Sequence, residues 1–299
     1  MKRTITLFIC AIFMLTLFAG CGSKDNNSAS SKDGSQFDTS REINVISREE
    51  GSGTRGAFVE LFGILQKDSS GNKIDYTTEE ARIANNTSVM MTSVAGDKYS
   101  IGYISLGSLN DTVKALKIDS VEPTVENVKS GQYKVARPFI IVTKGDISEV
   151  TKDFIDFILS SDGQKVVEEN GYIPVSNKPT YSGNKPTGKV VVAGSSSVSP
   201  LMEKLKEAYL AVNPNAQIEI QTNDSTAGIN AAIEGICDIG MSSRELKESE
   251  LNAGLTPITI AMDGLVVIVN KENPVENLTS EQVRAIFTGE ITQWSEVME

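Results

Sequence analysis

Histidine is absent from this sequence of 299 residues, tryptophan occurs once, and 28 basic residues are outnumbered by 39 acidic ones. Without histidine the chain has no Ser-His-Asp triad, no imidazole ligand for a metal and no side chain that ordinarily titrates near neutral pH. A metal site would depend on carboxylates alone, and we expect none. The formal net charge of −11 argues against nucleic acid or an anionic membrane surface as a partner.

Cysteine is also scarce, and one of the three cysteines lies at the end of an export signal. Two basic residues precede an apolar run, residues 5–18, which is too short for an ordinary membrane span. The run leads into LFAGC, which resembles the signal of bacterial lipoproteins, in which the cysteine, here Cys21, receives lipid. We therefore expect residues 1–20 to be a signal peptide and the lipid to hold the protein on the outer face of the cell membrane. A plain secretory signal cut near Ala19 is the alternative.

Residues 21–41 are polar and low in complexity, which is typical of a flexible tether. Once Cys10 is removed with the signal and Cys21 carries lipid, only Cys237 remains, and an intramolecular disulfide is excluded. Burial as a small hydrophobic side chain is its expected role.

The stretch INVISREEGSGTRGAFVELF, residues 43–62, predicts a strand, a polar turn over residues 47–54 and a helix from about Arg55. Backbone N–H groups at the start of a helix have no intrahelical partner, and the helix dipole adds partial positive charge there. Arg48, just upstream, supplies a planar cation that matches an oxyanion. The stretch is therefore a candidate anion-binding turn.

The second half of the sequence alternates strands with helices, which predicts parallel sheets flanked by helices. A proline- and glycine-rich segment, residues 174–188, precedes it and is the best linker candidate. Residues 258–260 and 265–269 read as two separate strands.

Three further hydroxyl-rich turns follow strands in that half. They are Gly194-Ser195-Ser196-Ser197, Asp224-Ser225-Thr226-Ala227-Gly228 and Ser242-Ser243, the last with a helix expected to begin near Ser243. Any one of them is explained by ordinary helix capping. Four such turns in one α/β chain favour a shared ligand site, because ligands bind at the carboxyl ends of the strands in open α/β sheets.

These motifs resemble a known family, the phosphate-binding proteins that serve phosphate-specific ABC importers. The segments that carry the resemblance are GSSSVSPLMEKLKEAY, DSTAGINAAIEG, DIGMSSREL, AMDGLVVIVN, IFTGEITQW and SREEGSGTRGAF. The resemblance implies a two-lobed α/β fold of the periplasmic-binding-protein type II class, with the ligand between the lobes. It also implies an extracytoplasmic, monomeric receptor that passes inorganic phosphate to the transmembrane subunits of an ABC permease, uses no cofactor and is not an enzyme.

The order of the motifs differs from the family pattern, in which the GSSSVSP half comes first. This chain is therefore similar to a circular permutant, in which residues 174–188 join the family's usual ends. The permutation predicts that Arg41 and Glu299 lie near each other. The resemblance also implies one lobe built from residues 42–137 with 263–299 and a continuous lobe of residues 138–262.

The resemblance further implies a set of ligand contacts from both lobes. Hydroxyl and backbone N–H groups would come from serines of one lobe, and the other lobe would give the charged Arg48, supported by Glu50, and the helix N-terminus. The implied phosphate-binding residues are Ser196, Ser197, Ser225, Ser243, Arg48, Ser52, Gly53 and Thr54.

Ser243 departs from many family members, which carry at this position an aspartate that accepts the proton of phosphate and repels sulfate. Sulfate and molybdate therefore stay open as alternative ligands. Asp263, near an expected lobe crossing, has no assigned role beyond that of a turn or capping residue.

The segment GSGTRG also fits the G-x-G-x-x-G pattern of dinucleotide-binding enzymes. Three polar residues separate the strand from its first glycine, which loosens the tight turn that this fingerprint needs. A nucleotide-binding enzyme is therefore the weaker alternative.

Overall fold

This computed structural model describes residues 37–298. A nine-stranded sheet forms the centre of this part of the chain. The expected signal peptide, Cys21, most of the tether and Glu299 lie outside these described residues. None of the described helices combines the length and apolarity needed to span a bilayer.

The strand order in this sheet is β10-β9-β11-β8-β12-β5-β1-β4, and β6 also pairs with β12. These strands are β1 (Asn44–Arg48), β4 (Arg82–Ala84), β5 (Ser100–Ser105), β6 (Lys114–Ala115), β8 (Ala136–Lys144), β9 (Gly188–Ser195), β10 (Ala216–Asn223), β11 (Ile239–Ser242) and β12 (Leu255–Val269). Two small separate pairs join β2 (Leu65–Lys67) to β3 (Lys73–Asp75) and β7 (Lys117–Ile118) to β13 (Asn277–Leu278). The α/β class expected from the sequence is confirmed.

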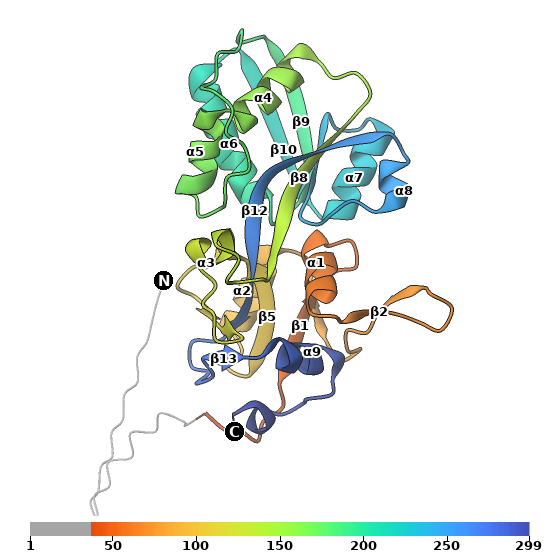
Figure 1. Cartoon of the computed structure of the whole chain (residues 1–299), viewed down its shortest axis with the longest axis vertical. Helices are drawn as coiled ribbons and strands as arrows, with labels where there is room; N and C mark the ends of the chain where they lie inside the picture. The colour runs from red at the N-terminus through yellow and green to blue at the C-terminus, as the bar shows by residue number, and fades with distance from the viewer. Residues whose placement is uncertain (1–36, 299) are drawn as a thin grey trace, which may run out of the picture. The chain divides into compact units, whose positions relative to one another are not determined.

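The expectation of parallel sheets is only partly correct. Neighbours are parallel within β10-β9-β11 and within β5-β1-β4. The pairs β11-β8, β8-β12 and β12-β5 are antiparallel. The reason is that β8 and β12 connect the β10-β9-β11 part of the sheet with the β5-β1-β4 part and run in opposite directions. The two strands lie side by side in Figure 1.

The strand β12 is one continuous element of 15 residues, not the two short strands expected. Its pairing with β8 shifts register between Thr259 and Ala261 and continues through Asp263, which faces Arg137. A charged residue usually ends a buried strand, but here the facing guanidinium compensates the carboxylate.

Buried hydrophobic side chains form separate clusters on either side of these crossing strands. We call residues 42–137 with 263–298 the terminal lobe and residues 138–262 the central lobe. In the terminal lobe, α1 (Gly53–Leu61) and α9 (Ser280–Thr288) cover one face of the sheet and α2 (Thr87–Ala95) covers the other. In the central lobe, α4 (Glu149–Leu159), α5 (Ser161–Glu169) and α6 (Ser199–Val212) lie opposite α7 (Ser225–Glu234). The short helices are α3 (Val125–Lys129) and α8 (Glu248–Leu251), with 3-10 turns at Leu106–Ser108 and Trp294–Val297.

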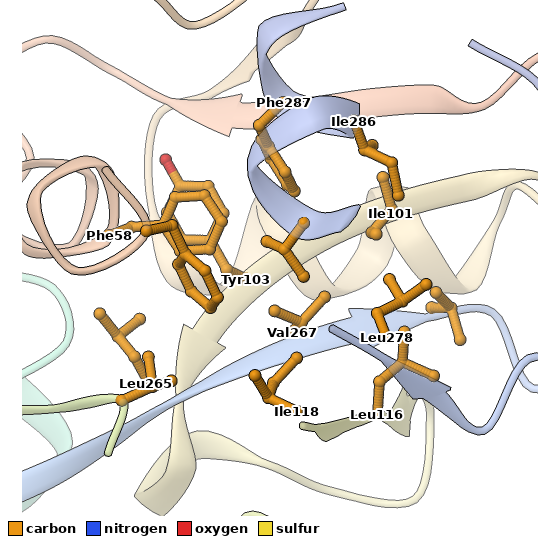
Figure 2. Close-up of a cluster of buried hydrophobic side chains, with 14 of the residues drawn as sticks. Phe58, Ile101, Tyr103, Leu116, Ile118, Leu265, Val267, Leu278, Ile286 and Phe287 are labelled. Atoms are coloured by element: carbon orange, nitrogen blue, oxygen red, sulfur yellow. The ribbon is translucent and has the colours of Figure 1, made fainter. Parts of the chain in front are cut away.

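Aromatic packing fixes the position of α1 in the terminal lobe. The ring of Phe58 stacks on that of Tyr103 from β5, with centroids 3.8 Å apart and planes 7° from parallel. Phe287 of α9 meets Phe58 edge-on, with ring centroids 4.7 Å apart, and Figure 2 shows the three rings together. Such pairs contribute roughly 0.5–1.5 kcal/mol each beyond their buried area. The start of α1 is thereby held in a defined place.

The described ends of the chain lie beside each other. Ile43 donates its N–H to the carbonyl of Thr292 at 2.7 Å, and Trp294 donates to the carbonyl of Arg41 at 3.2 Å. Ser295 likewise donates to Thr39 at 2.7 Å. Arg41 is therefore next to the C-terminal segment, as the permutation predicts, although Glu299 itself lies outside the described residues.

Residues 174–187 contain no helix or strand, but this segment is not a loose linker. Gln164 Oε1 accepts the N–H groups of Val175 and Ser176 at 2.8 and 3.2 Å. Tyr181 donates its hydroxyl to Asp153 Oδ2 at 2.5 Å, and its ring packs edge-on against Phe157. The segment is therefore fastened to α4 and α5.

Candidate functional site

Three of the four hydroxyl-rich turns open helices, as expected. Ser52 caps α1 by accepting the N–H of Arg55 at 3.3 Å, and Asp224 caps α7 by accepting that of Ala227 at 2.8 Å. The turn after β9 leads into α6, which begins at Ser199. These helix N-termini place partial positive charge at the boundary between the lobes.

The helix expected near Ser243 is wrong, because α8 begins only at Glu248. The hydroxyl of Ser242 accepts the N–H of Arg244 at 3.3 Å and donates to its carbonyl at 2.9 Å. Arg137 Nη1 donates to the carbonyl of Ser243 at 3.2 Å. These bonds occupy backbone groups that a helix needs, so the chain bends at Ser243 and Arg244 and does not form a helix there.

Hydroxyl groups from both lobes meet around Ser243. The distance from Thr54 Oγ1 to Ser197 Oγ is 2.7 Å, and that from Ser195 Oγ to Ser243 Oγ is 2.9 Å. Ser243 Oγ also lies 3.4 Å from Ser225 Oγ and 3.5 Å from Thr54 Oγ1. The structure therefore brings together hydroxyls that are up to 189 positions apart in the sequence.

Arg48 adds one buried positive charge to this group. Its side chain is 2% exposed, and Nη2 donates to Ser196 Oγ of the central lobe at 3.1 Å. Nε donates to Glu49 and to the carbonyl of Ala84. Nη1 is buried and has no hydrogen-bond partner among residues 37–298. An unpaired N–H of a buried cation is costly, so this atom marks a place for an acceptor.

The partner of Arg48 differs from the one expected. Glu49, not Glu50, binds the guanidinium in a two-point contact, at 2.8 Å to Nε and 2.7 Å to Nη2. Glu50 is exposed at the following position of the turn. Glu49 is half-buried beside Arg48, whereas Glu50 faces solvent, so only the first carboxylate is placed to bind the guanidinium.

Gly53 lies at a close approach between the two lobes. A Cβ atom at this position would overlap the hydroxyl of Ser225 and would lie 2.8 Å from that of Ser243. Glycine is therefore required by close approach of the backbone to the facing serines.

Tyr103 of β5 stabilises the turn that follows β1. Its hydroxyl contacts Ser47 Oγ at 2.9 Å and accepts the N–H of Arg48 at 3.1 Å. Burial raises the pKa of Tyr103 to about 12, so the hydroxyl stays neutral. The backbone of Arg48 is thus held by a side chain of the adjacent strand.

One hydroxyl in this group was missed in the sequence. Thr87, the first residue of α2, has its Oγ1 3.3 Å from Ser197 Oγ and 3.5 Å from Ser196 Oγ. The sequence signal is the turn Asn85-Asn86-Thr87-Ser88 after β4, a fifth polar turn between a strand and a helix. A cleft of about 610 Å³ opens beside it, lined by residues 85–88 of the terminal lobe and by Ser196, Ser199, Pro200, Glu203, Thr222 and Asn223 of the central lobe.

The chemistry of this group suits an oxyanion. Arg48 supplies charge, the hydroxyls can donate or accept hydrogen bonds, and the helix ends add N–H donors. Across residues 37–298 there is no cluster of three or more acidic or cysteine side chains arranged to hold a metal ion. Cys237 is buried among hydrophobic side chains next to α7 and lies apart from these hydroxyls.

Comparison with known proteins gives matches over nearly the whole chain. The PBP superfamily domain matches residues 28–162 and 179–298. The phosphate-binding protein PstS 2 of Streptococcus agalactiae is 53% identical over 297 residues, 99% of this chain and 98% of the relative. A crystal structure of the phosphate-binding protein of a phosphate ABC transporter from Streptococcus pneumoniae is 46% identical, with a TM-score of 0.68, and the match covers 86% of this chain and 99% of that one.

A more distant relative aligns over a shorter length. The phosphate-binding protein PstS of Bacillus subtilis is 31% identical over 125 residues, which is 41% of this chain and 42% of the relative. The long matches at high identity decide the family. This chain belongs to the PBP superfamily and, within it, to the family of the phosphate-binding proteins PstS.

Proposed function

We propose that this protein is an extracytoplasmic receptor that binds inorganic phosphate between its two lobes. The observation that carries the proposal is the buried guanidinium of Arg48, whose Nη1 lacks a partner among the described residues beside hydroxyls from both lobes. A small anion with several acceptor oxygens would satisfy Nη1 and the surrounding donors together. The names of the relatives point to the same ligand.

In this proposal the central lobe contributes the hydroxyls of Ser196, Ser225 and Ser243 and the backbone N–H of Ser197. The terminal lobe contributes Arg48 and the first turn of α1, formed by Ser52, Gly53 and Thr54. The global charge of −11 opposes anion binding, so affinity must come from these local groups.

The ligand class is set by the balance of donors and acceptors. Phosphate at neutral pH keeps a proton and therefore needs one hydrogen-bond acceptor in the site. Sulfate and molybdate carry no proton at this pH and need no such acceptor. Glu49 is engaged by Arg48, so the serine hydroxyls are the available acceptors, with Ser243 at their centre. A hydroxyl rejects sulfate less strictly than a carboxylate would, and we propose phosphate as the preferred ligand rather than the exclusive one.

Delivery to an ABC-type permease, without covalent chemistry, completes the proposed role. The S. pneumoniae relative is described as part of a phosphate ABC transporter. Lipid at Cys21 would keep a monomeric receptor at the outer face of the membrane. The binding event would bring the lobes together about β8 and β12.

The chain is, in this proposal, a circular permutant of the wider family. The described ends lie side by side, and residues 174–187 would form the join. The short alignment with the B. subtilis protein supports a changed order of halves, because one collinear alignment can then follow only one half.

Calorimetric titration of the purified protein with phosphate, sulfate and molybdate tests the proposal. We expect saturable phosphate binding, weaker binding of the other two anions, and a loss of at least about 30-fold in Arg48→Ala, because truncating a buried charge partner costs about 2–5 kcal/mol. Arg284→Ala is the charge-matched control, since Arg284 pairs with Glu290 on the surface. Sulfate binding as tight as that of phosphate, or full affinity in Arg48→Ala, would contradict the proposal.

A further inference from the structure

Thr87 lies at the boundary of the two lobes because of the way α2 begins. Asn86 caps the helix by accepting the N–H of Val89 at 2.8 Å, which leaves Thr87 as the first helical residue. Its side chain is 5% exposed, although it lies on the first turn of a surface helix. The threonine therefore points away from solvent, toward the central lobe.

The contacts of Thr87 are with residues of the proposed site. Its Oγ1 lies 3.3 Å from Ser197 Oγ and 3.5 Å from Ser196 Oγ. Ser196 also receives Nη2 of Arg48 at 3.1 Å, and Nε of Arg48 reaches the carbonyl of Ala84, three residues before Thr87. Arg48 and Thr87 thus approach Ser196 together from the terminal lobe.

The distances distinguish Thr87 from a hydroxyl that is already satisfied. Hydrogen bonds between hydroxyls are usually about 2.7–2.8 Å long, and Thr54 Oγ1 meets Ser197 Oγ at 2.7 Å. Both contacts of Thr87 are longer, at 3.3 and 3.5 Å, so its hydroxyl can exchange them for a closer acceptor. Because Thr87 and Ser196 also line the cleft between the lobes, such an acceptor would be held on the cleft side of the site.

We propose that Thr87 is a further anion-binding residue, which donates its hydroxyl to an oxygen of the bound oxyanion beside Ser196 and Arg48. The inference rests on the proposed function, because it adds a contact to the same site. The first turn of α2 then faces the anion together with the first turns of α1 and α7. The terminal lobe would hold the anion by two helix ends rather than one.

The test compares three variants by calorimetric titration with inorganic phosphate. Thr87→Val removes the hydroxyl and keeps the shape of the side chain. We expect a five- to tenfold rise in Kd, which corresponds to the loss of about one hydrogen bond. Thr87→Ser restores the hydroxyl and should stay within about twofold of the unchanged protein. Thr92→Val is the control, since it makes the same change at an exposed position of the same helix.

A melting curve for each variant separates a binding role from a structural one. If valine packs badly and lowers the melting temperature, Thr87→Ala gives the same comparison without added bulk. Unchanged phosphate affinity in a folded Thr87→Val protein would overturn the assignment of Thr87 and leave the proposed function standing. Failure of the unchanged protein to bind phosphate would overturn both. A crystal structure with phosphate should place Thr87 Oγ1 within about 3 Å of a phosphate oxygen.

Discussion

Arg137 and Asp263 face each other across the two strands that connect the lobes, and their side chains are 2% and 0% exposed. Nε and Nη2 of Arg137 both reach Asp263 Oδ2 at 3.1 Å, and Ser105 donates its hydroxyl to Oδ1 at 2.8 Å. Nη1 of the same guanidinium holds the carbonyl of Ser243 at 3.2 Å. One ion pair thus joins β8, β12 and the hydroxyl site.

Replacing Asp263 by asparagine should destabilise the protein strongly. Burial raises the pKa of Asp263, and the neighbouring Arg137 opposes that shift by favouring the ionised carboxyl. Asp263→Asn leaves the arginine buried without a counter-charge, and we expect the free energy of unfolding to fall by about 3–5 kcal/mol. Urea denaturation followed by circular dichroism measures this change.

The matched control for Asp263 is Glu122→Gln. Glu122 pairs with Lys117 at 3.3 Å on the surface, and its loss should cost less than about 1 kcal/mol. Equal stabilities of the two variants would show that the buried pair is dispensable.

Gly53→Ala should weaken phosphate binding without unfolding the protein. The added Cβ would meet the hydroxyls of Ser225 and Ser243 across the lobe boundary. Forcing an extra methyl group into a packed place costs about 1–3 kcal/mol, so we expect Kd for phosphate to rise at least about fivefold.

Gly56→Ala is the control for Gly53, because it lies on the same helix. Its Cβ would meet only the side chain of Arg244, at 3.1 Å from Cδ, and no hydroxyl of the site, so affinity should stay within about threefold. Calorimetric titration of both variants decides the point. A Gly53→Ala protein with full affinity would mean that the lobes need not approach this closely to bind the anion.

Local sequence patterns were sufficient to place the strand and helix of residues 43–62 and three of the four hydroxyl-rich turns at helix starts. The capping role of Ser52 and the strand-to-helix turn at Ser225 follow from residue types and spacing over a few positions. Such signals depend only on neighbouring residues, so they can be recognised in the sequence without knowledge of contacts between distant residues.

What sequence patterns could not give depends on contacts between distant residues. The bend at Ser243 and the unbroken β12 both contact Arg137, which lies 106 positions from Ser243 and 126 from Asp263. The choice of Glu49 over Glu50 depends on which carboxylate the fold places half-buried beside Arg48. The position of Thr87 in the site could not be predicted, because it depends on contacts with Ser196 and Ser197 of the other lobe and not on residues near Thr87 in the sequence.

Glu250→Gln should reduce stability at neutral pH and lose its effect in acid. Burial alone would raise the pKa of Glu250, but hydrogen bonds from Arg244 and from the N–H of Lys247 hold it below the ordinary value of 4.5. Arg244 in turn contacts Thr226, which donates to the carbonyl of Gly51 in the other lobe. Glu250 therefore supports a contact between lobes that lies outside the hydroxyl site.

The sign of the pH dependence follows from the lowered pKa. A carboxyl with a depressed pKa in the folded state stabilises the protein above its unfolded pKa, and this contribution disappears as pH falls through the folded pKa. We expect Glu250→Gln to lose about 2 kcal/mol at pH 7 and to approach the unchanged protein below about pH 4. Urea titrations across this range measure the difference. Glu245→Gln, at an exposed position nearby, should show no such trend.

On the proposed permutation, a chain in which the two halves are exchanged should remain a functional receptor. The rearranged chain would begin at Asn184, run to Met298, pass through a short Gly/Ser linker to Phe37 and end at Gly183. The linker is short because Ser295 already donates to Thr39 at 2.7 Å. The cut falls after Tyr181, whose bond to Asp153 fastens the preceding residues to α4.

The exchange replaces the join of residues 174–187 by a shorter linker. Because the free energy of loop closure changes by only about 0.6 kcal/mol for each doubling of loop length, the cost should be about 1 kcal/mol. We expect cooperative unfolding and a Kd for phosphate within about tenfold of that of the unchanged chain. A second rearrangement, cut between Phe157 and Ile158 inside α4, should not fold, because it divides a helix that packs against the sheet. Loss of folding in the first rearrangement would show that the fastened segment 174–187 is part of the core rather than a replaceable join. Binding by the first and not the second would support the permutation directly, since only then are the present termini interchangeable with that join.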